Sequence, residues 1–323
     1  MRLTKEKLTD LFFQMLRIHR MQLAVEGRYH LDEMKTPIHL GIGQEAIAVG
    51  VCAHLRRDDY ISSTHRGHGH YLAKGGDLKA LMAELHCRET GCSRGRGGSM
   101  HLVDTAVGHL GSSSIVGGGI PIATGLGLSI KMQGQDRVSV AFFGDGAADE
   151  GVLYESVNFA ILKRLPVVFV LENNEYSVCS HVSVRQAGKV LFHYLPQDFL
   201  PNVIVDGNSV LEVYDAAQTA IDRARRGEGS SFLECKTYRV RGHAGSWSDE
   251  KLGYRSAEEI RGWEARCPVT TFQQQLLAEG ILTDPEIKRM VAAIDTEIDE
   301  ALQFALDSPL PRRKGLHLYL YRE

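Results

Sequence analysis

Two short apolar runs, at residues 138–143 and 167–171, restrict this chain to a small set of folds. The stretch between them, 149–164, favours a helix, and a glycine turn follows the first run. Two strands joined through a helix lie parallel in one sheet, and strands that are apolar throughout are covered on both faces. The same alternation repeats at 203–205, 209–226 and 232–240. The pattern predicts an α/β fold with an open, mainly parallel sheet flanked by helices, and ligands bound beyond the carboxyl ends of its strands.

Further helices are predicted on both sides of this region. Near the N-terminus, apolar residues from Leu8 to Leu16 recur at the spacing of one helix face. Asp77 is placed to cap another helix, and the helices expected lie at 43–55, 77–86, 256–266, 269–279 and 284–307. Repeated glycines between 88 and 120 exclude long regular elements there. Because no repeat or linker interrupts the chain, we predict a single domain over residues 1–323, with N- and C-terminal helical extensions.

The composition excludes several classes of function. A net charge of −3 and a pI near 6.5 provide no electrostatic basis for binding nucleic acid or an acidic membrane, so a phosphate site would have to be local. The apolar runs are shorter than the about 18 residues of a membrane-spanning helix, and the first residues are charged rather than apolar. We therefore expect a cytoplasmic protein, or one of an organelle matrix. The cysteines form no CxxC pair, which is typical of reduced thiols.

Polar residues end both strands of the central unit, as Gly144-Asp145-Gly146 and as Glu172-Asn173-Asn174. In a βαβ unit both strand ends open on one edge of the sheet, so Asp145 and Asn174 should lie side by side. Their carboxylate and amide oxygens suit Mg²⁺, which often completes its shell with phosphate oxygens. The two glycines permit a sharp turn and a close approach of the backbone, and a helix starting near Ala148 points its N–H groups at an anion. The spacing predicts a Mg²⁺–diphosphate site.

Two other interpretations of these motifs remain open. Glycines between a strand and a helix also mark nicotinamide sites, although here the third fingerprint glycine would fall on Asp149. A second glycine string, at 41–46, fits GxGxxA but follows no clear strand, and we predict that it binds no nucleotide. The three histidines within 65–70 are spaced to converge on a transition metal, but Arg66 among them would repel a divalent ion and attract a diphosphate.

These motifs resemble those of a known family. Gly-Asp-Gly at 144–146, closing with Asn173-Asn174, is similar to the thiamine diphosphate motif. Over roughly residues 8–300 the chain also resembles the alpha subunit of the decarboxylating component of 2-oxo acid dehydrogenase complexes, which include pyruvate, acetoin and branched-chain enzymes. The segments that carry this resemblance are THRGHG at 64–69, GRGGSMH at 95–101, IVG at 115–117 and YRVRGH at 238–243.

The resemblance implies the thiamine-diphosphate-binding fold and a specific set of site residues. It assigns the Mg²⁺ shell to Asp145, Asn174 and the backbone carbonyl of Tyr176. His243 matches an active-site histidine near the reacting carbon of the cofactor, where an imidazole can exchange protons. His68 is a second catalytic candidate, with an ordinary loop histidine as the alternative. The residues assigned to the cofactor are His65 (tyrosine in many relatives), Arg66, Ser114, Val116, Gly144, Asp145, Gly146, Ala147, Asn174, Tyr176 and His243.

The predicted function is that of an alpha subunit of a thiamine-diphosphate- and Mg²⁺-dependent 2-oxo acid (pyruvate) or acetoin dehydrogenase. Such an oxidoreductase cleaves its substrate and passes the acyl group to a lipoyl acyltransferase. The resemblance assigns the other half of the cofactor site to a separate beta subunit, within an alpha-two beta-two heterotetramer. One alternative is half of a transketolase-like or acyloin-forming thiamine enzyme without a lipoyl partner. The other is a nicotinamide-binding dehydrogenase or a cofactor-binding protein without catalysis.

Overall fold

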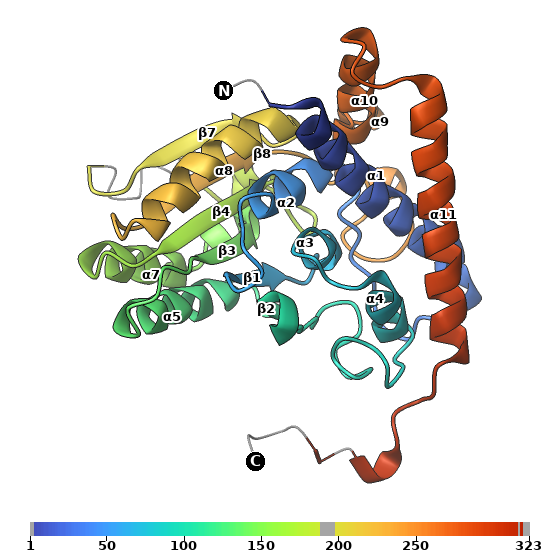
Figure 1. The fold of residues 1–323 in the computed structure, drawn as a ribbon, viewed down its shortest axis with the longest axis horizontal. Helices are drawn as coiled ribbons and strands as arrows, with labels where there is room; N and C mark the ends of the chain where they lie inside the picture. The colour runs from blue at the N-terminus through green and yellow to red at the C-terminus, as the bar shows by residue number, and fades with distance from the viewer. Residues whose placement is uncertain (1–2, 188–197, 316, 319–323) are drawn as a thin grey trace.

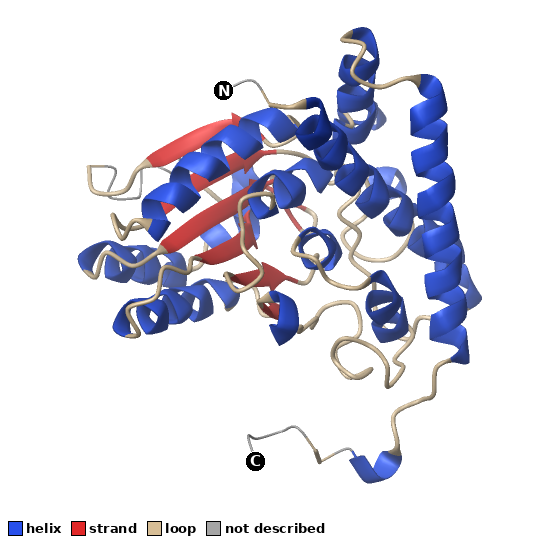
Figure 2. Ribbon diagram, viewed as in Figure 1, coloured by secondary structure: helices blue, strands red, loops and turns tan. Residues whose placement is uncertain are grey.

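The core of the protein is a parallel β-sheet whose strands follow the order β2-β1-β3-β4-β8-β7 (Figures 1 and 2). The computed structural model describes residues 3–187, 198–315 and 317–318. All neighbouring strands of this six-stranded sheet are parallel. The strands are β1 (Tyr60–Thr64), β2 (His109–Ser113), β3 (Ser139–Gly144), β4 (Val167–Asn173), β7 (Asn202–Asp206) and β8 (Ser231–Lys236). The predicted α/β class with a parallel sheet is confirmed.

The two central strands are buried on both faces, as their continuous apolar sequences predict. On β3, Ala141 and Phe143 pack with one side of the sheet, whereas Val140 and Phe142 pack with the other. Strand β4 is buried along its whole length. The register aligns Gly144 with Glu172, so the polar residues that end β3 and β4 start from the same edge of the sheet.

Helices cover both faces of the sheet and form a further layer beyond one end of it. The helices α5 and α7 share one apolar core with β3 and β4, and α2 and α8 share another on the opposite face. A third core joins α1, α4, α10 and α11. Their bounds are α1 (Lys5–Arg28), α2 (Glu45–Cys52), α3 (His68–Ala73), α4 (Leu78–Leu85), α5 (Gly119–Met132), α6 (Asp145–Ala148), α7 (Gly151–Leu162), α8 (Val210–Arg225), α9 (Ala257–Glu264), α10 (Pro268–Ala278) and α11 (Asp284–Asp307).

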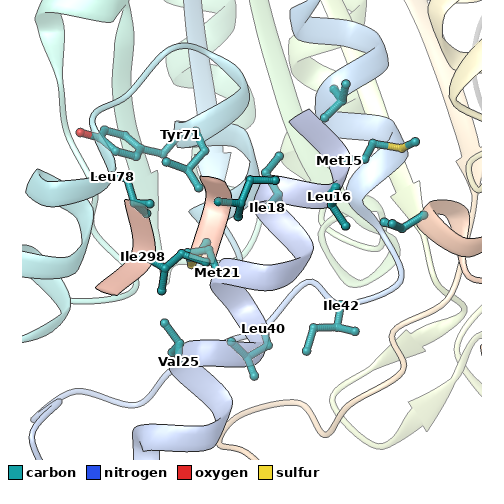
Figure 3. Packing of buried hydrophobic residues seen from close by; sticks show 14 of the residues in the cluster. Met15, Leu16, Ile18, Met21, Val25, Leu40, Ile42, Tyr71, Leu78 and Ile298 are labelled. Carbon is teal, nitrogen blue, oxygen red and sulfur yellow. The ribbon is translucent and has the colours of Figure 1, made fainter. Parts of the chain in front are cut away.

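The terminal helices form the predicted extensions and pack on each other. Figure 3 shows Met21 and Val25 of α1 near Ile298 of α11, within one buried cluster. Asp77 caps α4 as expected, because its side chain accepts the N–H of Ala80 at 2.7 Å, and the structure adds a capping box at Thr283, where α11 begins. None of the described helices is both long enough and apolar enough to cross a membrane. The cytoplasmic location stays a prediction.

Parts of the fold differ from the sequence-based expectation. The strand predicted at 232–240 ends at Lys236, because its neighbour β4 ends opposite, at Asn173. The following residues leave the sheet, and Val240 donates its N–H to Ile42. Helix α5 was not predicted, since its glycines weaken the helical pattern. One of them is needed for packing: a Cβ on Gly127 would lie 2.3 Å from a methyl carbon of Val167.

Candidate cofactor site at the carboxyl edge of the sheet

A cavity of about 320 Å³ opens where β1, β2, β3 and β4 end. Every residue that the resemblance assigns to the cofactor lines this cavity, although these residues come from five separate segments of the chain. They are His65, Arg66, Ser114, Val116, Gly144, Asp145, Gly146, Ala147, Asn174, Tyr176 and His243. The fold therefore gathers the predicted set at one place, at the sheet edge where an α/β protein binds its ligands.

The two predicted side-chain ligands of Mg²⁺ follow adjacent strands. Asp145 directly follows β3 and begins α6, and Asn174 directly follows β4. Both are buried and line the same cavity. The Asn174 Oδ1 accepts the backbone N–H of Tyr176 at 3.1 Å, which fixes the direction of the amide. Tyr176, whose carbonyl is the third expected ligand, begins the short hairpin of β5 (Tyr176–Ser177) and β6 (Ser180–His181).

Asp145 carries a negative charge in a place that is shielded from water. Burial raises the pKa of its carboxyl, and the ion pair with Arg185 acts against that rise. Arg185 was not among the predicted site residues, because it lies 40 residues from Asp145 and belongs to no recognisable motif. The presence of a guanidinium on this carboxylate shows that the position favours a cation, as a metal site requires.

The floor of the cavity carries an excess of positive charge. Arg66 is buried and donates hydrogen bonds to the backbone carbonyls of Leu40 and His243. Burial, followed by the charge of Arg239, lowers the pKa of Arg66 to about 9. Arg239 itself shares the buried Asp249 with a second arginine, Arg255. Two guanidinium groups on one carboxylate leave a net positive charge near Arg66, which suits an anion such as a diphosphate.

Three neutral histidines gather at one wall of the cavity. The ring nitrogens of His39, His65 and His243 lie within 4.8 Å of one another. Burial, and next the charge of Arg66, lowers their pKa values to about 3, 2 and 4 respectively. All three imidazoles are therefore neutral near pH 7 and can donate or accept hydrogen bonds. The cationic surroundings that disfavour their protonation also disfavour a divalent metal at this cluster.

His39 was missed by the sequence analysis because it precedes a glycine string that matches no nucleotide site. The structure explains this string differently. Gly245 donates to the carbonyl of Ile38 at 2.9 Å, and Val240 donates to that of Ile42 at 3.2 Å, so the two segments lie side by side. Gly43 has a φ of +96°, and a Cβ there would meet Val240 at 2.8 Å. The string therefore supports the His243 segment through close backbone packing.

The other predicted histidine does not reach the cavity. His68 begins α3 with its side chain buried, and its Nε2 lies 2.8 Å from the Ser99 hydroxyl. It is absent from the cavity lining among the described residues. The next histidine, His70, contacts Glu172 at 3.2 Å beneath the site. The spacing within 65–70 thus sends its histidines in different directions, and they form no common metal site in the described structure.

Comparisons with known proteins agree with this geometry. The family profile described as "Dehydrogenase E1 component" matches residues 13–314. The chain is 40% identical over 321 residues to the alpha subunit of acetoin:2,6-dichlorophenolindophenol oxidoreductase from Bacillus subtilis, covering 99% of this chain and 95% of the relative. It is 36% identical to the pyruvate dehydrogenase E1 component subunit alpha of Porphyra purpurea, covering 99% and 94%. The corresponding subunit from Zymomonas mobilis is 39% identical, covering 97% and 88%.

Proposed function

The chain belongs to the dehydrogenase E1 component family, and we propose that it is the alpha subunit of a thiamine-diphosphate- and Mg²⁺-dependent acetoin or pyruvate dehydrogenase. The observation that carries this proposal is the cavity, since one space gathers every cofactor residue that the sequence motifs assign. The family match argues against the nicotinamide-binding alternative. The two relatives named for acetoin and pyruvate leave both substrates as candidates.

The residues of the cavity fit the proposed cofactor. Asp145, Asn174 and the carbonyl of Tyr176 would hold Mg²⁺, at a position whose burial and charge favour a cation. Arg66 and the neutral His65 would hold the diphosphate, within the positive surroundings of the cavity floor. Ser114 and Val116, which follow β2, would place backbone groups against the aminopyrimidine ring. The bound cofactor would supply the carbon nucleophile and the electron sink of the reaction.

His243 is proposed as the protein group that moves a proton beside the reacting carbon. Its pKa of about 4 makes the imidazole neutral at working pH, so that it can donate or accept a hydrogen bond along which a proton moves. Its carbonyl is held by Arg66, and its ring contacts that of His39 with centroids 5.1 Å apart. These contacts fix the direction from which the imidazole meets a substrate. His68 is not proposed as a catalytic residue, since its side chain lies outside the cavity lining.

A beta subunit is proposed to complete the site. The relatives are named as alpha subunits, which implies a second type of chain. Ile115, which lines the cavity, and Ile122 in the first turn of α5 are large apolar side chains that are exposed by more than half. Apolar side chains at the rim of a site are typical of a protein interface. We propose an alpha-two beta-two assembly, with a lipoyl acyltransferase as the acceptor of the acyl group.

The test is to co-purify the chain with its beta subunit and to assay the complex. We expect 2,6-dichlorophenolindophenol reduction with acetoin or pyruvate that requires Mg²⁺, thiamine diphosphate and the beta subunit. Calorimetric titration should show binding of thiamine diphosphate and none of NAD. Product analysis separates acyl transfer to a lipoyl group from the acyloin-forming alternative. Failure of thiamine diphosphate to bind the complex in the presence of Mg²⁺ would refute the proposed function.

A further inference from the structure

The guanidinium of Arg185 lies against the carboxylate that we assign to Mg²⁺. One terminal nitrogen pairs with Asp145 and the other with Asp149, while the Nε donates to the carbonyl of Ser180 at 3.2 Å. The side chain of Arg185 is 14% exposed and that of Asp145 is 3% exposed, so their ion pair is largely shielded from water. A group of the protein itself therefore supplies the positive charge next to Asp145.

Other cations near the cavity are engaged elsewhere. Arg66 donates to backbone carbonyls, and Arg239 and Arg255 pair with Asp249. Within the described residues, Arg185 is the cation that forms an ion pair with Asp145. A buried carboxylate without a counter-charge is unfavourable. Arg185 therefore stabilises the ionised form of the carboxylate that a metal needs.

The backbone brings Arg185 back to this position by a short path. After Asn174 the chain forms the β5–β6 hairpin and a single 3₁₀ turn (Val182–Val184), in which Val182 donates to the carbonyl of Glu175 at 2.7 Å. Arg185 closes the turn by donating its N–H to Val182 at 3.0 Å. The segment that follows Asn174, one proposed metal ligand, therefore places Arg185 beside Asp145, the other. Its neighbour Gln186 also bonds Asp149, at 2.7 Å, which anchors the turn there.

We propose that Arg185 takes the place of the metal cation in the metal-free protein: it pairs with the Asp145 carboxylate before the metal binds, and Mg²⁺ displaces it from Asp145 while Asp149 retains it. The displacement step rests on the proposed function. A guanidinium and Mg²⁺ repel each other at one carboxylate, so they compete for Asp145. The Asp149 side chain is 29% exposed and already binds the other nitrogen of Arg185. The exchange therefore needs only a small movement of Arg185.

The first test titrates Mg²⁺ into the cofactor-stripped complex of the chain with its beta subunit, at a fixed and saturating concentration of thiamine diphosphate. Calorimetry or protein fluorescence reports binding without any turnover. Arg185→Gln removes the competing cation and should lower the half-saturating Mg²⁺ concentration by roughly threefold or more. Arg185→Lys keeps the charge and should stay closer to the wild-type value.

Arg56→Gln is the matched control for that titration. It also removes one arginine, but this arginine pairs with the surface residue Asp136 and lies outside the cavity lining. Its half-saturating Mg²⁺ concentration should equal that of the wild type. A wild-type value in Arg185→Gln would overturn the competition. A higher value would also overturn it, because Arg185 would then support the metal-bound site.

The second test needs no cofactor and so separates this proposal from the proposed function. Thermal unfolding of the wild type, Arg185→Gln, Asp145→Asn and the double variant forms a double-mutant cycle. Arg185→Gln should lower the melting temperature of the wild type but should have little further effect in the Asp145→Asn background. Additive losses would overturn the Arg185 proposal even if thiamine diphosphate binds. Coupled losses without any thiamine diphosphate binding would instead refute the proposed function, and with it the displacement step.

Discussion

Replacing Asp145 with asparagine tests the proposed metal site with almost no change in side-chain volume. Asp145 is the one charged ligand in the proposed Mg²⁺ shell, beside the amide of Asn174 and the carbonyl of Tyr176. Groups that only orient metal ligands are worth about 10–100-fold in metal affinity. Loss of the charged ligand itself should therefore weaken Mg²⁺-dependent binding of thiamine diphosphate by about 100-fold or more.

The expected change in thermal stability follows from mass action. At about 100 times its dissociation constant, the cofactor stabilises the folded chain by about 2.7 kcal/mol. An unfolding entropy of about 2.1 cal/mol/K per residue gives roughly 0.7 kcal/mol/K for 323 residues, so the unfolding transition of this chain should rise by about 4 °C in the wild type. In Asp145→Asn the same concentration is close to the dissociation constant, where stabilisation is about 0.4 kcal/mol. The rise should then fall below about 1 °C.

Scanning calorimetry of the complex with the beta subunit, with Mg²⁺ or with a chelator, measures both rises. Asp136→Asn is the control, because Asp136 pairs with Arg56 at the surface and does not line the cavity. It should keep the full cofactor-induced rise. A wild-type rise in Asp145→Asn would refute the assignment of this carboxylate to the metal. A wild-type rise that persists in the chelator would refute the need for a metal.

Three further predictions concern the histidines and the glycine turn. His243→Ala should leave thiamine diphosphate affinity within about twofold but slow dye reduction by about 10²–10⁴-fold, the usual worth of a proton-transferring group; unchanged turnover would remove His243 from the mechanism. His39 has a folded-state pKa of about 3 against an ordinary 6.5, so the unfolded chain binds the extra proton between these values, and stability should fall as pH drops below 6.5. His39→Phe should reduce that slope by up to about 1.4 kcal/mol per pH unit in urea unfolding from pH 6.5 to 5, and an unchanged slope would show that His39 does not cause it. A Cβ on Gly146 would lie 2.4 Å from the Ser177 hydroxyl oxygen. Gly146→Ala should therefore lower the free energy of unfolding by about 1–3 kcal/mol in urea unfolding. Gly151→Ala is the control, because a Cβ there meets open space and should not destabilise the fold.

The parts of the fold that were predictable are those where burial leaves a continuous local signal. Strands β3 and β4 are apolar throughout because helices cover both of their faces, and α11 begins and ends where its pattern predicts. Strand β1 carries serines instead, and one of them, Ser63, lies 2.7 Å from a ring nitrogen of His70. A strand whose polar residues are satisfied by a side chain from outside the strand has no alternating or apolar pattern. Its position became visible only in the folded chain.

The site residues also divide into those with a local sequence signal and those placed only by the folded chain. Asp145 and Asn174 were predictable because strand ends place them, and the family motifs extended that set to the other cavity residues. His39 and Arg185 were not, since each reaches the site through contacts with segments far away in the sequence. His68 is the opposite case, because it lies within a recognisable motif but the first turn of α3 directs it toward Ser99. A motif therefore identifies a segment near the site, and the local backbone decides which side chains enter it.

The charges of the cavity explain why the metal and the diphosphate should bind together. At one end Asp145 favours a cation, and at the other the buried Arg66 favours an anion. A diphosphate alone would pair with Arg66 and leave Asp145 paired with Arg185, whereas Mg²⁺ alone would leave Arg66 without an anion. Mg²⁺ bound to a diphosphate matches both ends at once and brings the metal the phosphate oxygens that its shell needs. Each component should therefore raise the affinity of the other by the same factor, because coupling between two ligands of one site is reciprocal.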